Sequence, residues 1–339
     1  LGETAHEPGP VRIETALARN PAPAQVLVEK AASASPLLVV RDLEKRFELR
    51  HGLLRRVIGE VHAARAVSFE IGRGQTLGLV GESGSGKSTV GRCILRLTEP
   101  DRGSVQMDGV DVTKLSRASM DDLRGDMQIV FQDPYASLIP RKTVYDIVGE
   151  PLVIHRKASG SELEDRIAWL FRKVGLRPEH MSRSPHEFSG GQPQRIGIAR
   201  AIALRLKLLI GDEPVSALDV SVRAQIVNLM IDLQEELGVS YLFISHDMAV
   251  VERMSHRIAV MRAGEIVEIG QRQQILAEPQ HPYTRKLISA VPAIDPGRRH
   301  VIRPISVETP VSAIRPPNWN PGSMVYESAG VDHKYAVDR

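Results

Sequence analysis

The sequence has 339 residues, 42% of them hydrophobic and 25% charged, which is enough apolar material for the core of one large domain or two smaller ones. The net charge is only +3 and aromatic residues make up 4% of the chain, so a basic face with stacking aromatics for nucleic acid is not expected. No stretch approaches the roughly 20 uncharged apolar residues that span a bilayer.

The beginning of the chain has the composition of a linker. Residues 1–36 are rich in Ala, Pro, Glu and Ser, and they lack both an initiator Met and a signal pattern. We therefore expect a soluble, intracellular protein whose first ordered element begins at Leu37, which is consistent with a segment cut from a longer chain. The one cysteine, Cys93, excludes a disulfide framework or four-cysteine metal site here, and we interpret it as a buried apolar residue.

Apolar segments after the linker predict strands. Leu37–Val40 opens the folded part, and Val61–Ile71 alternates in the manner of a second strand. Thr76–Val80 is a continuous apolar run, typical of a strand buried on both faces. A helix is expected to follow over Thr89–Leu97.

Between that strand and that helix lies a glycine-rich loop of the pattern Gly-x-x-x-x-Gly-Lys-Ser. In this context the pattern predicts a phosphate-binding loop, because the backbone N–H groups and the helix N-terminus converge on an anion. Lys87 would reach the β- and γ-phosphates of ATP and the Ser88 hydroxyl would bind Mg²⁺, whereas the alternative is an ordinary Gly/Ser turn. The loop residues are Gly81, Glu82, Ser83, Gly84, Ser85, Gly86, Lys87, Ser88 and Thr89.

The middle of the chain changes character twice. Ser104–Gly109 is interpreted as a hairpin edge, and Met127–Phe131 as a short strand that ends at Gln132. From Asp133 to about residue 190 helical patterns dominate, and Ser161 with Glu164 matches a capping box for one of these helices. This region is predicted to be an inserted helical subdomain.

Strands and helices then alternate, which predicts a mostly parallel sheet covered by helices. The expected strands are Lys207–Asp212, Tyr241–Ser245 and Arg257–Met261, and the expected helix is Val220–Leu237, closed by Gly238. The tail from about Gln271 carries one more helix, Pro282–Val291, and an irregular end is expected after Pro292.

Three strand ends carry side chains suited to phosphate chemistry. Parallel strands place their carboxyl ends at one edge, so Asp212, Glu213, Gln132 and His246 are expected beside the phosphate loop. Asp212 would hold Mg²⁺ and Glu213 would act as general base, while Gln132 would contact Mg²⁺ or the attacking water and His246 the γ-phosphate. Taken singly, the acids could be a solvated strand end and the histidine could be structural.

A second glycine turn precedes the helix expected over Gln194–Ile202. Ser189, Gly190, Gly191 and Gln192 have the composition of an anion-binding nest. Since one triphosphate needs only one cradle, this turn suggests completion of a site in another subunit. An ordinary capped helix is the alternative.

In this order the motifs resemble those of the ATP-binding cassette (ABC) ATPases, over about Leu37 to Pro292. The resemblance implies an α/β P-loop NTPase core of mainly parallel sheet with flanking helices, an antiparallel β subdomain and a helical subdomain. It implies a head-to-tail pair of nucleotide domains, in which Ser189 and Gly191 of one close over the γ-phosphate held by the other. Asp219 matches a further nucleotide-binding motif, and Phe47 matches the aromatic that stacks on adenine, although a core Phe is the competing interpretation.

Further segments are similar to the oligopeptide, dipeptide and nickel importer branch. They are Phe131–Leu138, Asp212–Ser221 and His281–Leu287, the last in a stretch that resembles this branch's C-terminal extension. The resemblance divides the chain into 37–270, the nucleotide-binding domain, and 271–339, the extension. Within the branch, Tyr241–Arg253 is most similar to the second half of tandem glutathione importer ATPases. An iron–sulfur cluster of some relatives is not carried over, since the extension has no cysteine.

The resemblance implies an ATPase, with ATP and Mg²⁺, that powers peptide uptake from the cytoplasmic face of the membrane. The implied partners are a second nucleotide-binding domain, two integral membrane permease subunits and, indirectly, a periplasmic or extracellular substrate-binding protein, with no nucleic acid. The alternatives are a nickel importer, a soluble ABC ATPase acting on nucleic acid or ribosomes, and a binding-only cassette. Pro193, where the family has a basic or polar residue, is the departure that favours the last of these.

Overall fold

The computed structural model describes residues 35–51, 56–290, 314–316, 319 and 324–337. The predicted linker therefore lies almost wholly outside the described residues. The strands are β1 (Leu38–His51), β2 (Arg56–Ile71), β3 (Thr76–Val80), β4 (Arg102–Met107), β5 (Val110–Asp111), β6 (Met127–Val130), β7 (Leu208–Asp212), β8 (Ser240–Ser245), β9 (Arg257–Arg262), β10 (Glu265–Gln271), β11 (Ile314–Arg315), β12 (Val325–Gly330) and β13 (His333–Val337). The helices are α2 (Lys87–Ile94), α3 (Arg117–Leu123), α4 (Pro134–Ser137), α5 (Val144–Ile154), α6 (Gly160–Lys173), α7 (Gln192–Ala201), α8 (Val220–Leu237), α9 (Met248–Met254), α10 (Arg272–Ala277) and α11 (Pro282–Ser289).

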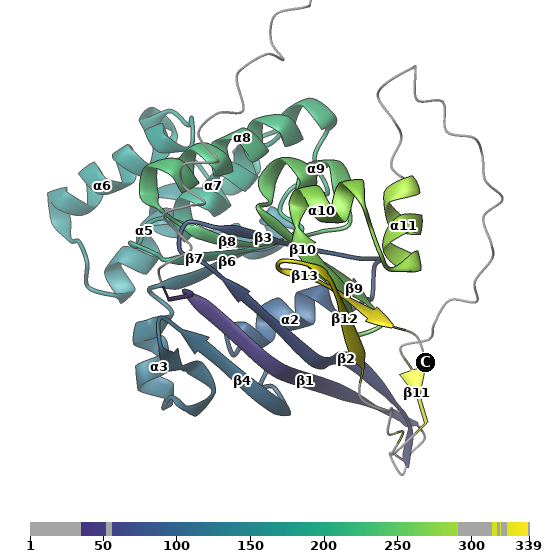
Figure 1. The fold of residues 1–339 in the computed structure, drawn as a ribbon. Helices are drawn as coiled ribbons and strands as arrows, with labels where there is room; N and C mark the ends of the chain where they lie inside the picture. Colours follow the sequence, from purple (N-terminus) through teal and green to yellow (C-terminus); the bar gives the residue numbers. More distant parts are fainter. Residues whose placement is uncertain (1–34, 52–55, 291–313, 317–318, 320–323, 338–339) are drawn as a thin grey trace, which may run out of the picture. The chain divides into compact units, whose positions relative to one another are not determined.

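Within the described residues these strands form two sheets (Figure 1). The larger has eight strands in the order β12-β13-β10-β9-β3-β8-β7-β6, and its stretch from β9 to β6 is parallel. The smaller has five strands in the order β11-β2-β1-β4-β5, all antiparallel. The predicted mixed architecture, with a parallel core and an antiparallel portion, is confirmed.

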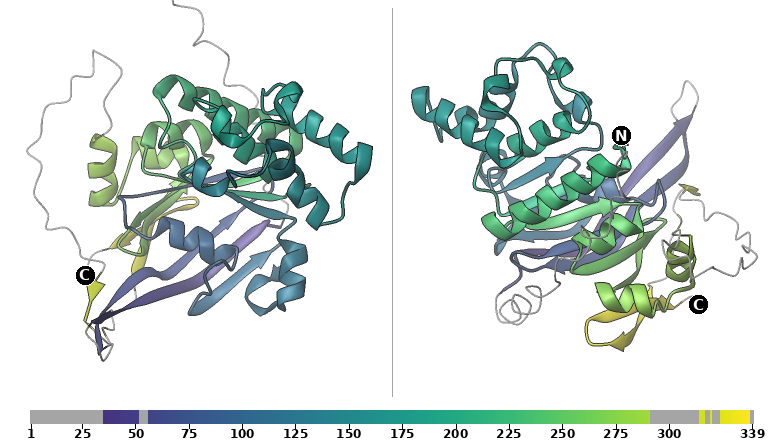
Figure 2. Two further views of the ribbon diagram at one scale, coloured as in Figure 1. Left: turned by 180° about the vertical axis from the view of Figure 1, so that it is seen from behind. Right: turned by 90° about the horizontal axis from the view of Figure 1, so that it is seen from above.

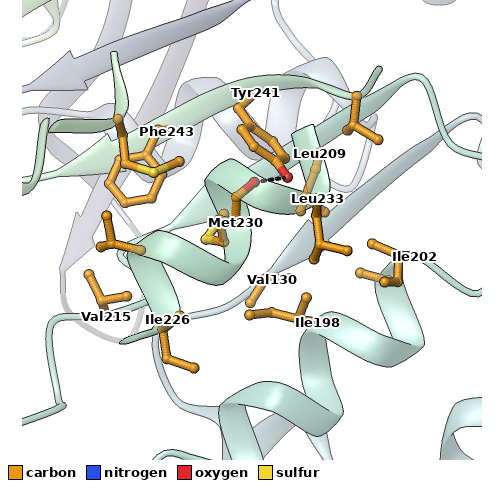
Figure 3. Packing of buried hydrophobic residues seen from close by; sticks show 14 of the residues in the cluster. Val130, Ile198, Ile202, Leu209, Val215, Ile226, Met230, Leu233, Tyr241 and Phe243 are labelled. Carbon is orange, nitrogen blue, oxygen red and sulfur yellow. Dashed lines mark hydrogen bonds between the residues drawn. The ribbon is translucent and has the colours of Figure 1, made fainter. Parts of the chain in front are cut away.

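Helices α5 to α9 lie on one face of the larger sheet, and the smaller sheet with α2 lies on the other (Figures 1 and 2). Because side chains alternate along a strand, each parallel strand supplies both cores. Leu209 and Phe243 pack among the helices, whereas Leu208 and Leu242 pack against α2 and the smaller sheet. Figure 3 shows the helix side, where the Tyr241 hydroxyl donates to the carbonyl oxygen of Met230 (2.9 Å). This two-sided burial explains the continuous apolar runs of the sequence.

The antiparallel sheet is larger than the sequence indicated. β2 begins at Arg56 rather than at Val61, and it pairs with β1 almost to the end of the hairpin. Residues 52–55 lie outside the described residues. The hairpin edge expected over Ser104–Gly109 is present as the pair β4 and β5.

The helical insertion contains one wrong prediction. Ser161 does not cap a helix: α6 begins at Gly160, its N-cap residue is Ser159, and no side-chain hydrogen bond caps it. A capping box does occur in the insertion, at Thr143 and Asp146 in front of α5. Gly175, just after the end of α6, has a φ of +71°, a left-handed conformation that glycine adopts without strain.

The prediction of an irregular tail after Pro292 is also wrong in part. β12 and β13 form an antiparallel hairpin, and β13 pairs with β10 at the edge of the larger sheet. β12 is exposed along its whole length, so its sequence lacks the run of apolar residues that predicts a buried strand. Residues 291–313 lie outside the described residues. Among the described helices, none has the length and apolarity needed to cross a membrane.

Candidate functional site

The phosphate loop connects β3 to α2 and is shaped by two close backbone approaches. Gly86 has a φ of +105°, and a Cβ atom there would lie 1.8 Å from the carbonyl oxygen of Ala63 on β2. At Gly81 a Cβ atom would lie 2.1 Å from the carbonyl oxygen of Met261 on β9. Only glycine fits at either position, which fixes the loop between the two strands. The N-terminus of α2 therefore points its free N–H groups into the loop.

Lys87 begins α2 and is held by the loop that precedes it. Its side chain is buried, and its ammonium donates to the carbonyl oxygens of Gly81 and Glu82 (2.8 Å each). Burial lowers the pKa of Lys87 from its ordinary value, while the nearby carboxylates of Glu213 and Asp212 act in the opposite direction. A buried ammonium at the first residue of a helix is suited to contact phosphate oxygens.

Ser88 and Asp212 meet although 124 residues separate them. The Ser88 hydroxyl donates to the Asp212 carboxylate (2.5 Å). Asp212 ends β7 and is 5% exposed; burial raises its pKa, and the hydrogen bond from Ser88 opposes that rise. Among the described residues no cluster of three or more His, Cys, Asp or Glu could hold a metal ion. The pair of oxygen ligands nevertheless fits Mg²⁺, which commonly takes only one or two protein ligands and fills its shell with phosphate oxygens and water.

Glu213 follows Asp212 in an unusual backbone conformation. Its φ is +52°, which is rare for a residue other than glycine and is favoured at functional sites. The conformation is held by the bond from its N–H to the carbonyl oxygen of Ile244 (3.0 Å) and by the Ser216 hydroxyl, which donates to its carbonyl oxygen (3.0 Å). The Glu213 carboxylate in turn lies 3.0 Å from Nδ1 of His246. The two residues predicted to act on the terminal phosphate and water are therefore adjacent.

Gln132 was expected at the end of a strand, but it lies in the connection that follows β6. β6 ends at Val130, two residues before Gln132, and the Gln132 side chain is exposed. In the part of the chain that the structure describes, no hydrogen bond joins Gln132 to the cluster of Lys87, Ser88 and Asp212. The sheet order still places it at the edge where β7 presents Asp212.

Phe47 lies on β1 opposite Val61 and is 42% exposed, so it is not a core residue. The ammonium of Lys45 lies 5.5 Å from the centre of its ring. This aromatic face is available to a ligand, as stacking on adenine would require.

The second glycine turn differs from the phosphate loop. Ser189 and Gly190 are exposed, Gly190 has a φ of +60°, and the Ser189 N–H donates to Oε1 of Gln192 (3.3 Å). The helix after the turn begins at Gln192, two residues earlier than predicted, with buried Pro193 in its first turn where proline is tolerated. Asp219 is likewise exposed, at the N-cap of α8.

One hydrogen bond to the phosphate loop was not predicted from the sequence. The Glu82 N–H donates to the hydroxyl of Tyr283 on α11 (3.0 Å). The segment around Tyr283 served only to indicate a family, and no local pattern reveals a contact across 201 residues.

A phosphate loop at the carboxyl end of a parallel strand, with a lysine, a serine and an aspartate meeting beside it, defines a P-loop nucleotide-binding protein. Residues 64–216 match the family described as "ABC transporter", and residues 267–318 match "Oligopeptide/dipeptide transporter, C-terminal region". The chain belongs to the ATP-binding cassettes of ABC transporters, in the oligopeptide/dipeptide branch.

Similar proteins agree with this assignment. The chain is 54% identical over 302 residues to the glutathione import ATP-binding protein GsiA of Pectobacterium atrosepticum, covering 89% of this chain and 48% of that protein. It is 59% identical over 264 residues to the protein of the same name from Escherichia coli O6:H1, covering 78% of this chain and 42% of that protein. The chain thus spans about half the length of these curated relatives or slightly less.

Solved structures show the same fold. The cassette cbiO1 from Clostridium perfringens, described as part of an ABC transporter complex, has a TM-score of 0.62 at 26% identity, covering 72% of this chain and 92% of that one. The cassette MJ0796, dimeric and bound to ADP and Pi, has a TM-score of 0.62 at 28% identity, covering 69% and 98%.

Proposed function

We propose that this chain is the ATP-hydrolysing subunit of an importer that powers uptake of a small peptide, glutathione or a close analogue, through a separate membrane permease. The observation that carries the proposal is the hydrogen bond between Ser88 and Asp212 beside the buried Lys87 of the phosphate loop, whose charge interacts with Asp212. The names of the relatives support the cargo, and the match to the oligopeptide/dipeptide C-terminal region supports transport over the other uses of an ABC cassette.

The proposed site has three parts. The phosphate loop (Gly81 to Thr89) holds the triphosphate, Lys87 contacts its β- and γ-phosphates, and Phe47 stacks on the adenine. Ser88 and Asp212, with Gln132, hold Mg²⁺, which when bound neutralises charge on the phosphates. The third part comes from a second cassette. Its own glycine turn (Ser189, Gly190, Gly191 and Gln192) and its Asp219 would face the triphosphate held by the first cassette.

Hydrolysis is proposed to depend on the pair of Glu213 and His246. The Glu213 carboxylate accepts a proton from the attacking water, and its fixed backbone aims it from the end of β7. His246 Nδ1, 3.0 Å from that carboxylate, orients it and stands where it can stabilise charge on the γ-phosphate. Lys87 stabilises the same charge.

The proposed partners are a second nucleotide-binding domain, two integral membrane permease subunits and, indirectly, a substrate-binding protein outside the membrane. ATP binding closes the two cassettes and hydrolysis separates them. The proposed place of the chain is the cytoplasmic face of the membrane. We also propose the predicted division into residues 37–270, with a helical subdomain at about 133–190, and an extension over 271–339. The helical subdomain would contact the permease.

The deciding experiment measures uptake of labelled glutathione, a neutral dipeptide and nickel, in parallel, in cells of the source organism that lack this segment. We expect selective loss of glutathione uptake, restored by the intact sequence and not by Lys87→Ala. Loss of nickel uptake alone would establish the nickel alternative. Normal entry of all three cargoes would contradict the proposal and favour a cassette that does not serve these substrates.

A further inference from the structure

The C-terminal region reaches into the phosphate loop through one residue. Tyr283, in the first turn of α11, is 4% exposed, and its hydroxyl accepts the hydrogen bond from the Glu82 N–H at 3.0 Å. The N–H and the hydroxyl belong to segments 201 residues apart. α11 also packs against β10, which places it beside the larger sheet (Figure 1).

The peptide group that Tyr283 holds is the same one that Lys87 holds. The Glu82 N–H and the Gly81 carbonyl oxygen are the two ends of a single planar peptide unit. The Lys87 ammonium donates to that carbonyl oxygen at 2.8 Å, while the N–H donates to Tyr283. Hydrogen bonds in series polarise and orient one another in a buried setting. Tyr283 therefore fixes the plane that presents a carbonyl oxygen to Lys87.

Tyr283 is itself held firmly. Glu268 on β10 is fully buried and accepts the backbone N–H groups of Gln280 (2.8 Å) and His281 (3.0 Å). Nδ1 of His281 accepts the N–H of Tyr283 (3.1 Å) and so caps α11. The guanidinium of Arg262 lies 5.1 Å from the centre of the Tyr283 ring. These contacts and the burial of the ring restrain the Tyr283 side chain beside the loop, as a residue that sets another group's geometry requires.

We propose that Tyr283 is a positioning residue of the nucleotide site, which acts through the Gly81–Glu82 peptide group to place the Lys87 ammonium for the terminal phosphates. The inference rests on the proposed role of Lys87. By this proposal the C-terminal region contributes to nucleotide binding in addition to its structural role. The competing account is purely structural: the hydroxyl satisfies a buried N–H and affects only stability.

The test begins with Tyr283→Phe in the full 339-residue chain, with Tyr335→Phe as the matched control. Tyr335 also belongs to the C-terminal region, but its hydroxyl donates to exposed Glu327 rather than to the loop. Titration with a fluorescent ATP analogue in the presence of Mg²⁺ should show affinity reduced about fivefold for Tyr283→Phe, as expected for one lost hydrogen bond, and unchanged for Tyr335→Phe. In hydrolysis assays KM should rise by a similar factor with little change in kcat, because Lys87 contacts phosphate before and during the reaction.

A double-mutant cycle separates positioning from a structural role. If Tyr283 acts through Lys87, adding Tyr283→Phe to Lys87→Ala should cost no further affinity. The nucleotide-induced rise in melting temperature gives an independent reading of the same cycle. Equal losses in both backgrounds, or no loss in either, would overturn the inference. If Lys87→Ala itself leaves ATP affinity unchanged, the proposed site fails instead, so the two failures are distinguishable.

Discussion

The phosphate loop and the second glycine turn are built from similar sequence, yet the protein completes only one of them. Both are rich in glycine and both lead directly into a helix. In the first, Lys87 and Ser88 find partners on the loop itself and on β7. In the second, Ser189 and Gly190 remain exposed, and α7 packs among the other helices of the insertion. The first turn is thus completed by an acid at the edge of the sheet, Asp212, whereas the second leaves Ser189 and Gly190 at the surface.

The largest effect should come from Gly86→Ala, which tests whether the first cradle is fixed by its surroundings. The new Cβ atom would lie 1.8 Å from the carbonyl oxygen of Ala63, so either the loop or β2 must move. We expect nucleotide binding to be abolished. Gly84→Ala is the matched control, since Gly84 also has a positive φ (+79°) but nothing lies within 4 Å of its Cβ position; it should cost only about 1 kcal/mol of backbone strain.

Thermal unfolding of both glycine variants shows whether a loss of binding is local. If Gly86→Ala bound nucleotide as tightly as the unmodified chain, the close approach to β2 would not matter for the cradle. If Gly84→Ala failed as completely as Gly86→Ala, the approach to β2 would not be the deciding feature, and positive φ or contact of the new Cβ atom with bound phosphate would be the cause.

Glu213→Gln should have the next largest effect, and it separates holding ATP from cleaving it. The amide keeps the size of the carboxylate and can still contact His246, but it cannot accept a proton from water. We expect kcat to fall by about 10²- to 10³-fold while ATP affinity stays within a factor of about two. Steady-state phosphate release and nucleotide titration measure the two quantities separately. Brisk hydrolysis by this variant would show that another group is the base.

Much of the first cradle could be predicted from the sequence because its signals are local. The apolar run before Gly81 indicates a buried strand, and the rule that parallel strands end at one edge brings Asp212 to Ser88 across 124 residues. Likewise α8 has its predicted bounds, since its apolar period and Gly238 at its end are both readable.

What could not be predicted depends on contacts that leave no local trace. β12 is exposed along its whole length, and the hairpin of β12 and β13 is held by the pairing of β13 with β10. The bond from Glu82 to Tyr283 depends on the packing of α11 against β10, in a part of the chain 201 residues away from the loop. At Ser161 the pattern of a capping box was present, but α6 begins one residue before it. A motif of two residues therefore determines the start of a helix less strongly than the packing of that helix does.

The last prediction concerns the open turn, where Ser189→Arg should block a facing site without harming the chain's own. Ser189 is exposed, so the longer side chain has room and should not affect folding. We expect nucleotide binding by the single chain to be unchanged and hydrolysis to fall about tenfold or more, since a bulky cation displaces the hydroxyl and N–H groups offered to a γ-phosphate. Loss of ATP affinity in the single chain would mean that the turn serves its own loop.

Mixing this variant with Lys87→Ala then distinguishes a shared site from two independent ones. Each variant alone has no intact site, but a mixed pair joins the sound loop of one chain to the sound turn of the other. In an equal mixture about half of the pairs are mixed and each has one intact site, so about a quarter of the full rate should return. If no activity returns while both variants still pair, the two turns do not face each other in a head-to-tail dimer. A rate that is already present in Ser189→Arg alone would show instead that one chain completes its own site, and the contrast between the two turns would then have no functional meaning.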